Sequence, residues 1–132
     1  MIIEKQTHMP ELKLSQLQFE SDTWKRLLRF MTDENIHLKA RLSDILNEDF
    51  DKAMLEQAET FQVLFLRKDN LISLLRNEIA ELDNLLIKEA LEDGAWKKEV
   101  EKRMRIMRKN IKNAEGKFRK LKSEFNNYFL EK

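Results

Sequence analysis

Glu34 and His37 have the residue types and spacing of a metal site. A Glu-x-x-His pair places two ligands on one face of a helix, as in helical di-iron carboxylate proteins, which need a second such pair and two further glutamates from other helices. This sequence contains one copy, and His37 lies next to Leu38, outside the apolar stripe of its segment. We therefore expect both side chains to be solvated, and we predict no metal or cofactor site.

The usual signatures of catalysis are missing. The chain has two histidines and no cysteine, so the common general bases and nucleophiles are scarce. It contains no Gly-rich phosphate loop, no His-Glu-x-x-His motif and no nucleophile elbow. A narrow helical bundle is also expected to lack a pocket of the roughly several hundred Å³ that bound substrates occupy. We predict a protein that is not an enzyme and has no small-molecule substrate.

The elements that carry these residues are predicted to be three long helices. One proline and two glycines in 132 residues leave too few turn formers for a sheet protein. An apolar seven-residue repeat marks helices at about 11–46, 51–92 and 95–130. Asn47–Asp49 and Asp93–Gly94 separate them, and we expect Asp49 or Asp51 to cap the second helix.

Short connections between such helices predict an antiparallel, all-α three-helix bundle, elongated and running up-down-up. Each helix carries a seam of apolar residues spaced three and four apart, which we expect to form the core. Leu28, Phe65 and Phe118 are typical seam residues, and Trp24 is expected to anchor the first seam. Residues 1–10 are predicted to form an N-terminal arm that covers the tip near Gly94, and Gly116 is placed on an outer face.

Four polar residues interrupt the seams: Ser21, Asn35, Lys68 and Glu89. They could line a pocket or relay an ion, but buried polar residues in a heptad seam more often fix the register of the helices. We also expect Asn35 to form an amide cluster with Asn126 and Asn127, which the predicted turns bring to the same level.

A second set of apolar residues lies on outer faces, where the core does not need them. Aligned exposed apolar residues indicate contact with another molecule. We predict a surface for self-association or for docking a partner helix, formed by Leu12, Phe19, Leu27, Phe30, Val63, Leu66 and Leu74.

Charge is unevenly distributed along the chain, although its overall net charge is only +1. Nine basic residues and one acidic residue lie between 103 and 122, whereas residues 50–93 hold ten acids and five bases. Either this basic segment binds a polyanion, or it complements the acidic second helix inside the bundle. The residues of the alternative polyanion face are Arg105, Arg108, Lys109, Lys112, Arg119 and Lys120.

Length and composition favour one soluble domain. The chain is 42% apolar and 37% charged, with no apolar run long enough to cross a membrane and no secretory signal at its start. The absence of cysteine is compatible with a reducing, cytoplasmic setting. Together these features predict a structural or protein–protein interaction protein that forms a homodimer or binds a protein partner. Nucleic-acid or other polyanion binding is the weaker alternative.

Overall fold

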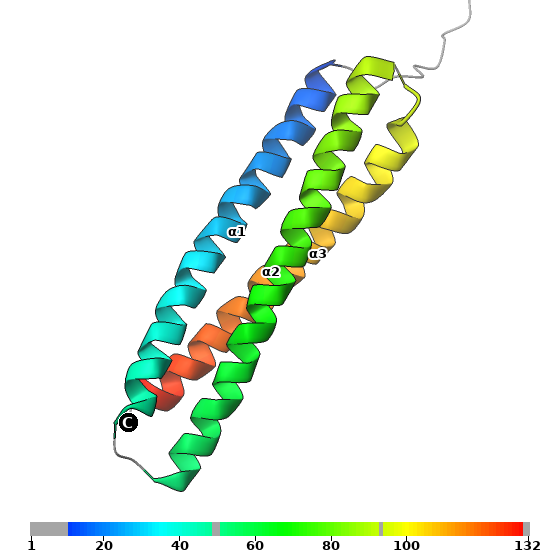
Figure 1. Cartoon of the computed structure of the whole chain (residues 1–132). Coiled ribbons are helices and arrows are strands. Elements are labelled where there is room, and N and C mark those ends of the chain that lie inside the picture. The colour runs from blue at the N-terminus through cyan, green and yellow to red at the C-terminus, as the bar shows by residue number, and fades with distance from the viewer. Residues whose placement is uncertain (1–10, 49–50, 93, 131–132) are drawn as a thin grey trace, which may run out of the picture. The chain divides into compact units, whose positions relative to one another are not determined.

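The computed structural model of this chain contains three long helices and describes residues 11–48, 51–92 and 94–130 (Figure 1). Helix α1 spans Glu11–Leu46 with 36 residues, α2 spans Lys52–Glu92 with 41, and α3 spans Lys97–Leu130 with 34. At a rise of about 1.5 Å per residue, each helix is about 50–60 Å long. The bounds confirm the predicted helices to within two residues, and the described ranges contain no strand. The predicted N-terminal arm lies outside the described residues.

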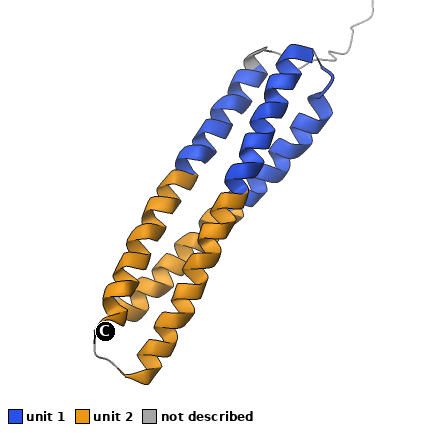
Figure 2. Ribbon diagram, in the orientation of Figure 1, with its two compact units in different colours: residues 1–27, 75–112 blue, residues 28–74, 113–132 orange. Residues whose placement is uncertain are grey.

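The helices contribute to two compact units (Figure 2). Unit 1 comprises Met1–Leu27 and Leu75–Lys112, and unit 2 comprises Leu28–Leu74 and Asn113–Lys132. Each unit therefore contains a stretch of all three helices. The fold class is the predicted all-α three-helix bundle, because within each unit the three stretches pack against one another.

Short connections set the direction of the helices. In unit 2 residues 47–51 join α1 to α2, and in unit 1 residues 93–96 join α2 to α3. Neighbours joined in this way run antiparallel, which gives the predicted up-down-up order. In unit 1 α3 also contacts α1 through Arg108 and Glu20, 2.7 Å apart, and in unit 2 through Lys122 and Glu34, 2.6 Å apart.

The predicted seams fill the core of each unit. The buried apolar residues of unit 1 are Leu17, Trp24, Leu75, Ile79, Leu82, Leu85, Leu86, Val100, Met104, Met107 and Ile111. Those of unit 2 are Leu28, Met31, Leu38, Leu42, Ala58, Phe61, Phe65, Ile72, Ala114, Phe118, Leu121 and Phe125. Their three-and-four spacing keeps one face of each helix inward, so the opposite faces remain on the outside.

The ends of α2 follow the predicted capping chemistry. The Asp51 carboxylate accepts a hydrogen bond from the backbone N–H of Met54 at 2.8 Å, as expected of an N-cap. After α2 ends, Gly94 has a φ of 95°, a left-handed conformation that favours glycine. Asp49, the other predicted cap, lies outside the described residues. Gly116 is exposed, and a Cβ at this position would meet open space beyond its own helix backbone, which confirms its place on an outer face.

An aromatic cluster packs between α2 and α3 in unit 2. The Phe125 ring contacts Phe61 and Phe65 edge-on, with centroids 5.3 and 5.2 Å apart. The rings of Tyr128 and Phe129 extend the cluster around Phe61, at centroid distances of 6.3 and 5.8 Å. Edge-to-face pairs of this kind add to the free energy of apolar burial.

Replacing Phe125 with alanine should lower the free energy of unfolding by about 3–5 kcal/mol, because the truncation leaves a cavity in this cluster. The matched control is Ile36→Ala, an exposed residue of α1, expected to change it by less than about 0.5 kcal/mol. Urea unfolding followed by circular dichroism measures both. Equal losses in the two variants would contradict the placement of Phe125 in the core.

Candidate functional site

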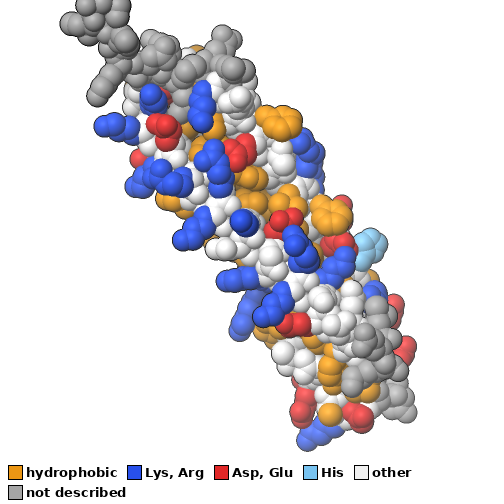
Figure 3. All heavy atoms as spheres, turned by 180° about the vertical axis from the view of Figure 1, so that it is seen from behind, with side chains coloured by type: hydrophobic (Ala, Val, Ile, Leu, Met, Phe, Trp, Pro, Cys, Tyr) orange, Lys and Arg blue, Asp and Glu red, His pale blue; other side chains and the backbone are white. Residues whose placement is uncertain are grey.

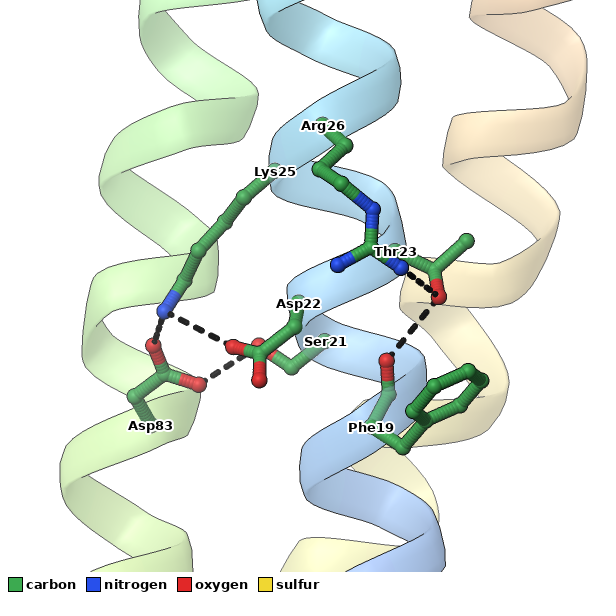
Figure 4. Close-up of polar contacts among 7 residues, drawn as sticks. All are labelled: Phe19, Ser21, Asp22, Thr23, Lys25, Arg26 and Asp83. Atoms are coloured by element: carbon green, nitrogen blue, oxygen red, sulfur yellow. Dashed lines mark hydrogen bonds and ion pairs between the residues drawn. The ribbon is translucent and has the colours of Figure 1, made fainter.

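Ser21 and Lys25 of α1 both bind Asp83 of α2 in unit 1, and we call this polar cluster a clasp (Figure 4). It fixes which side of α1 faces α2. The buried Ser21 hydroxyl donates a hydrogen bond to Asp83 at 2.5 Å, and the Lys25 ammonium pairs with the other oxygen of the same carboxylate. Lys25 also lies 3.6 Å from Asp22. The hydrogen bond to Asp83 raises the pKa of Lys25, against the opposing effect of desolvation. Ser21 is therefore buried in the seam and bonded to α2, as expected of a residue that selects one register.

The same arrangement recurs in unit 2. Its residues lie fourteen positions later on α1 and fourteen positions earlier on α2. The Asn35 amide donates to Asp69 at 2.7 Å and to the Phe65 carbonyl at 3.0 Å, and Lys39 pairs with Asp69 at 2.5 Å. Asn35 is fully buried, and its side-chain oxygen has no hydrogen-bond partner among the described residues. Any shift of α2 by one residue would break these bonds, so Asn35 also fixes register.

The predicted amide cluster around Asn35 is wrong. Asn126 instead accepts a hydrogen bond from Arg41 at 3.1 Å, and Asn127 is exposed. The Arg41 guanidinium also lies over the Phe125 ring, 5.5 Å from its centroid. Asn35 is turned toward α2, where Asp69 is a stronger acceptor than a neutral amide.

The other two polar seam residues differ from each other. Glu89 is buried and accepts a hydrogen bond from the backbone N–H of Trp96 at 2.9 Å, just before α3 begins. A carboxylate at this position stabilises the start of a helix. Lys68 is half-buried, and no ion pair joins it to an acid within the described ranges. Desolvation, and secondly the nearby charge of Lys117, lowers its pKa.

The Glu34–His37 pair does not converge on a ligand. Glu34 forms an ion pair with Lys122, whereas the His37 side chain is exposed on α1. Across the part of the chain that the structure describes, no three side chains of the metal-binding types come together. His37 is solvated as expected, whereas Glu34 is half-buried in its ion pair.

On α1, the predicted apolar surface residues differ in exposure. In unit 1 Phe19 is 67% exposed, and the Arg26 guanidinium lies 5.9 Å from its ring centroid (Figure 4). In unit 2 Phe30 is 59% exposed. Leu27 is half-buried, so its assignment to the outer surface is only partly correct. The side chain of Leu12 lies outside those that the structure describes.

On α2, all three predicted residues lie on the outside. Val63, Leu66 and Leu74 of unit 2 are 48, 50 and 55% exposed. Further exposed apolar residues were not predicted: Ile36, Leu55, Ile87, Leu91 and Ile106. The exposure of Ile87 and Leu91 could have been predicted from the sequence. Both fall on the three-and-four spacing that begins at Val63 on the same helix. We see no comparable pattern for Ile36, Leu55 or Ile106.

The basic residues of α3 divide into paired and unpaired cations. In unit 1 Arg108 donates two hydrogen bonds to Glu20 of α1, at 2.7 and 2.8 Å, which raises its pKa. Arg108 belongs to the predicted polyanion face, and in this structure its guanidinium forms a bidentate pair within the protein. Arg105, Lys109 and Lys112 are exposed and form no ion pair with any residue that the structure describes.

In unit 2, Arg119 lies 3.4 Å from Glu115 on its own helix, whereas Lys120 is exposed and has no such pair within the described ranges. Figure 3, the view from behind, shows many Lys and Arg side chains on that face, with Asp, Glu and apolar side chains among them. Four of the six predicted residues thus remain available to an external anion: Arg105, Lys109, Lys112 and Lys120.

Charge complementarity inside the bundle involves α1 more than α2. In unit 1 Arg103 of α3 lies 3.9 Å from Glu81 of α2, whereas Arg108 of α3 pairs with Glu20 of α1. The two α2 acids in the clasps, Asp69 and Asp83, pair with lysines of α1.

A shallow groove in unit 1 is larger than the sequence led us to expect. It lies between α2 and α3 and has a volume of about 310 Å³. Leu82, Ile106 and Met107 supply apolar wall, and Glu78, Glu81 and Arg103 supply charge. This volume is at the low end of the range for small-molecule sites. The expectation that such a bundle has no concavity of this size is wrong.

No family model, curated protein or solved structure matches this chain. Within the described residues, no helix has a stretch apolar enough to cross a bilayer.

Replacing Lys68 with methionine should raise the free energy of unfolding at pH 7 by about 0.5–1 kcal/mol, because an uncompensated half-buried charge becomes an apolar group. Burial lowers the pKa of Lys68 in the folded protein below its ordinary value of 10.5. At pH values between the pKa of Lys68 in the folded protein and its pKa in the unfolded chain, the unfolded chain binds more protons than the folded protein. The free energy of unfolding of the wild type therefore increases as the pH rises through this range. The advantage of Lys68→Met should therefore shrink toward pH 10.5.

The matched control is Arg67→Met, which removes a neighbouring exposed charge and should change stability by less than about 0.5 kcal/mol. Urea unfolding at several pH values measures both variants. A loss of stability in Lys68→Met at pH 7 would contradict the unfavourable burial of this ammonium.

Proposed function

We propose that this chain is a non-enzymatic helical interaction protein that self-associates as a homodimer through the outer faces of α1 and α2. The observation that carries the proposal is the exposure of large apolar side chains on those faces, Phe19 and Phe30 on α1 and Val63, Leu66 and Leu74 on α2. Water contact with such side chains is unfavourable by about 25 cal/mol for each Å². Burial against another copy removes that cost.

The core of each unit supports this proposal, because it is complete without these residues. Leu17, Leu28 and Ile79 are at most 3% exposed, and they belong to continuous buried seams. The outer residues therefore lie outside the buried core and keep about half or more of their surface in contact with water. Their alignment on helix faces favours an interface over scattered surface apolarity.

The Phe19 side chain further supports an interface in unit 1. Arg26 lies over the ring and donates a hydrogen bond to Thr23 at 3.1 Å, and Thr23 donates to the Phe19 carbonyl at 3.0 Å. The guanidinium over the ring is therefore itself held by Thr23. Stacking of this kind is compatible with an aromatic ring at an interface, where aromatic residues and arginine are enriched.

Sedimentation equilibrium at micromolar concentration should give about twice the 15.9 kDa mass of the chain. The double variant Phe19→Ser, Phe30→Ser should shift the mass toward the monomer and keep the helicity unchanged, since neither side chain is in the core. The control is Ile36→Ser, Ile106→Ser, which removes comparably exposed apolar groups from other faces. A pure 15.9 kDa species for the wild type would refute self-association.

Polyanion binding by α3 is a second candidate function. It is favoured by the exposed cations that lack ion pairs with described residues, Arg105, Lys109, Lys112 and Lys120. Cations that are not bound within the protein can neutralise phosphate or sulfate groups and release counterions.

Affinity for heparin or duplex DNA should then fall steeply between about 50 and 200 mM salt. The variant Arg105→Gln, Lys109→Gln, Lys112→Gln should lower the slope of log affinity against log salt by about two to three. A control with the same change in net charge is Arg29→Gln, Lys52→Gln, Arg67→Gln, which should keep most of the slope. Absence of binding at low salt would eliminate this candidate.

A further inference from the structure

A stripe of basic residues runs along the outer face of α3 in unit 1. Its members are spaced alternately four and three residues apart, which keeps them on one side of the helix. They are Lys98, Lys102, Arg105, Lys109 and Lys112. All five side chains are exposed, and none forms a hydrogen bond or ion pair with another residue that the structure describes. At about 1.5 Å per residue the stripe is about 21 Å long. We name it the α3 basic stripe.

A small hollow in unit 1 lies beside the middle of this stripe, between α1 and α3. Its volume is about 150 Å³, below the range of roughly 300–1,000 Å³ that is typical of sites for whole small molecules. Three cations, one acid and two core residues line it: Lys13 and Leu17 of α1, and Glu101, Met104, Arg105 and Arg108 of α3. The lining therefore has a net charge of +2, in a space suited to one anionic group of a larger ligand.

Arg108 can bind such a group without leaving its partner on α1. Its Nε and Nη2 atoms donate hydrogen bonds to the two oxygens of Glu20, at 2.7 and 2.8 Å. A guanidinium has five N–H groups, so three remain for a ligand. Arg105, which lines the same hollow, has all five. Arginine is the side chain that best matches the geometry of phosphate oxygens.

The composition of the α3 basic stripe favours a phosphate chain over an acidic protein helix. A docked helix needs apolar contact at the centre of the interface, where charged groups are depleted. The stripe contains no apolar residue, so a helix lying on it would desolvate charges on both sides. Duplex DNA instead carries one negative charge for about every 1.7 Å of its axis, and its binding is driven by the release of counterions.

The side chains of unit 1 favour contact with the nucleic-acid backbone over contact with bases. Four of the five stripe residues are lysines, which contact phosphates as point charges. Among the described residues, unit 1 has two aromatic rings outside its buried core, and a cation lies over each. Lys88 is 5.1 Å from the centroid of Trp96, and Arg26 is 5.9 Å from that of Phe19. Stacking of single-stranded bases, which relies on free rings, is therefore disfavoured.

We infer that unit 1 carries a site for the phosphate backbone of double-stranded nucleic acid. The hollow between α1 and α3 holds one phosphate, and the α3 basic stripe contacts its neighbours without regard to base sequence. This inference rests on the second candidate function, polyanion binding by α3, and names its ligand class. It also adds Lys13 of α1 to the site, and it identifies Glu101 as a residue that lowers affinity.

Lys13 tests the hollow because it lies on α1, outside the basic segment of α3. Lys13→Gln should weaken binding to a duplex of about 20 base pairs at least about threefold in 50 mM salt, and lower the slope of log affinity against log salt by about one. The matched control is Lys52→Gln, the same change at an exposed position of α2 in unit 2, which should alter neither. Fluorescence anisotropy of the labelled duplex measures both variants.

Glu101→Gln should change affinity in the opposite direction. Loss of this carboxylate removes a like charge from the neighbourhood of the bound phosphate, so binding should tighten at least about twofold. Glu124→Gln makes the same change in net charge on α3 in unit 2, outside the lining, and should tighten binding less than about 1.5-fold. Variants of Lys13 and Glu101 that behave like their controls would overturn the site in the hollow but leave polyanion binding by α3 standing.

The ligand class is tested with the wild-type chain. Two duplexes of unrelated sequence should bind with affinities within about twofold of each other, and a single strand of the same length should bind more weakly. Tighter binding of the single strand or of polyglutamate, or binding of heparin without binding of the duplex, would overturn the assignment to double-stranded nucleic acid. A chain that binds neither heparin nor the duplex at low salt would refute the second candidate function as well.

Discussion

The structure depends on one constraint: each helix can turn only one face inward. Apolar residues three and four apart place Leu28, Phe65 and Phe118 on that face, and their burial is the main favourable term in folding. The polar clasps at Asp83 and Asp69 then select one rotation and one register for α1 against α2. Once these faces are fixed, the outer faces are fixed as well, together with any surface that they carry.

The two clasps show how polar residues contribute specificity inside an apolar seam. Ser21 and Asn35 are buried at equivalent heptad positions, each beside a lysine four residues later and an aspartate on α2. A hydrogen-bonded ion pair that is partly desolvated contributes little net stability, but an alternative register would leave its carboxylate without partners. The clasps therefore limit the number of ways in which the apolar seams can slide.

The fold could be predicted from the sequence because its signals are local and repeated. The helix ends followed from Asp51 and Gly94, and the core followed from periodicity. Individual ion pairs could not be predicted, because they depend on how far α3 is displaced along α1. Arg105 and Arg108 look alike in sequence, yet only Arg108 reaches Glu20. For the same reason Asn126 meets Arg41 and not Asn35. The sequence predicts which face of a helix points inward, but it does not predict which residue of the neighbouring helix a given side chain will contact.

We propose that the molecule has two sets of helix faces, one that folds the chain and one that binds a second copy. The most direct test of this claim is the molar mass of the purified wild-type chain, measured by light scattering across micromolar concentrations. The account predicts a rise with concentration toward twice 15.9 kDa. A constant value of 15.9 kDa over the whole range would contradict it.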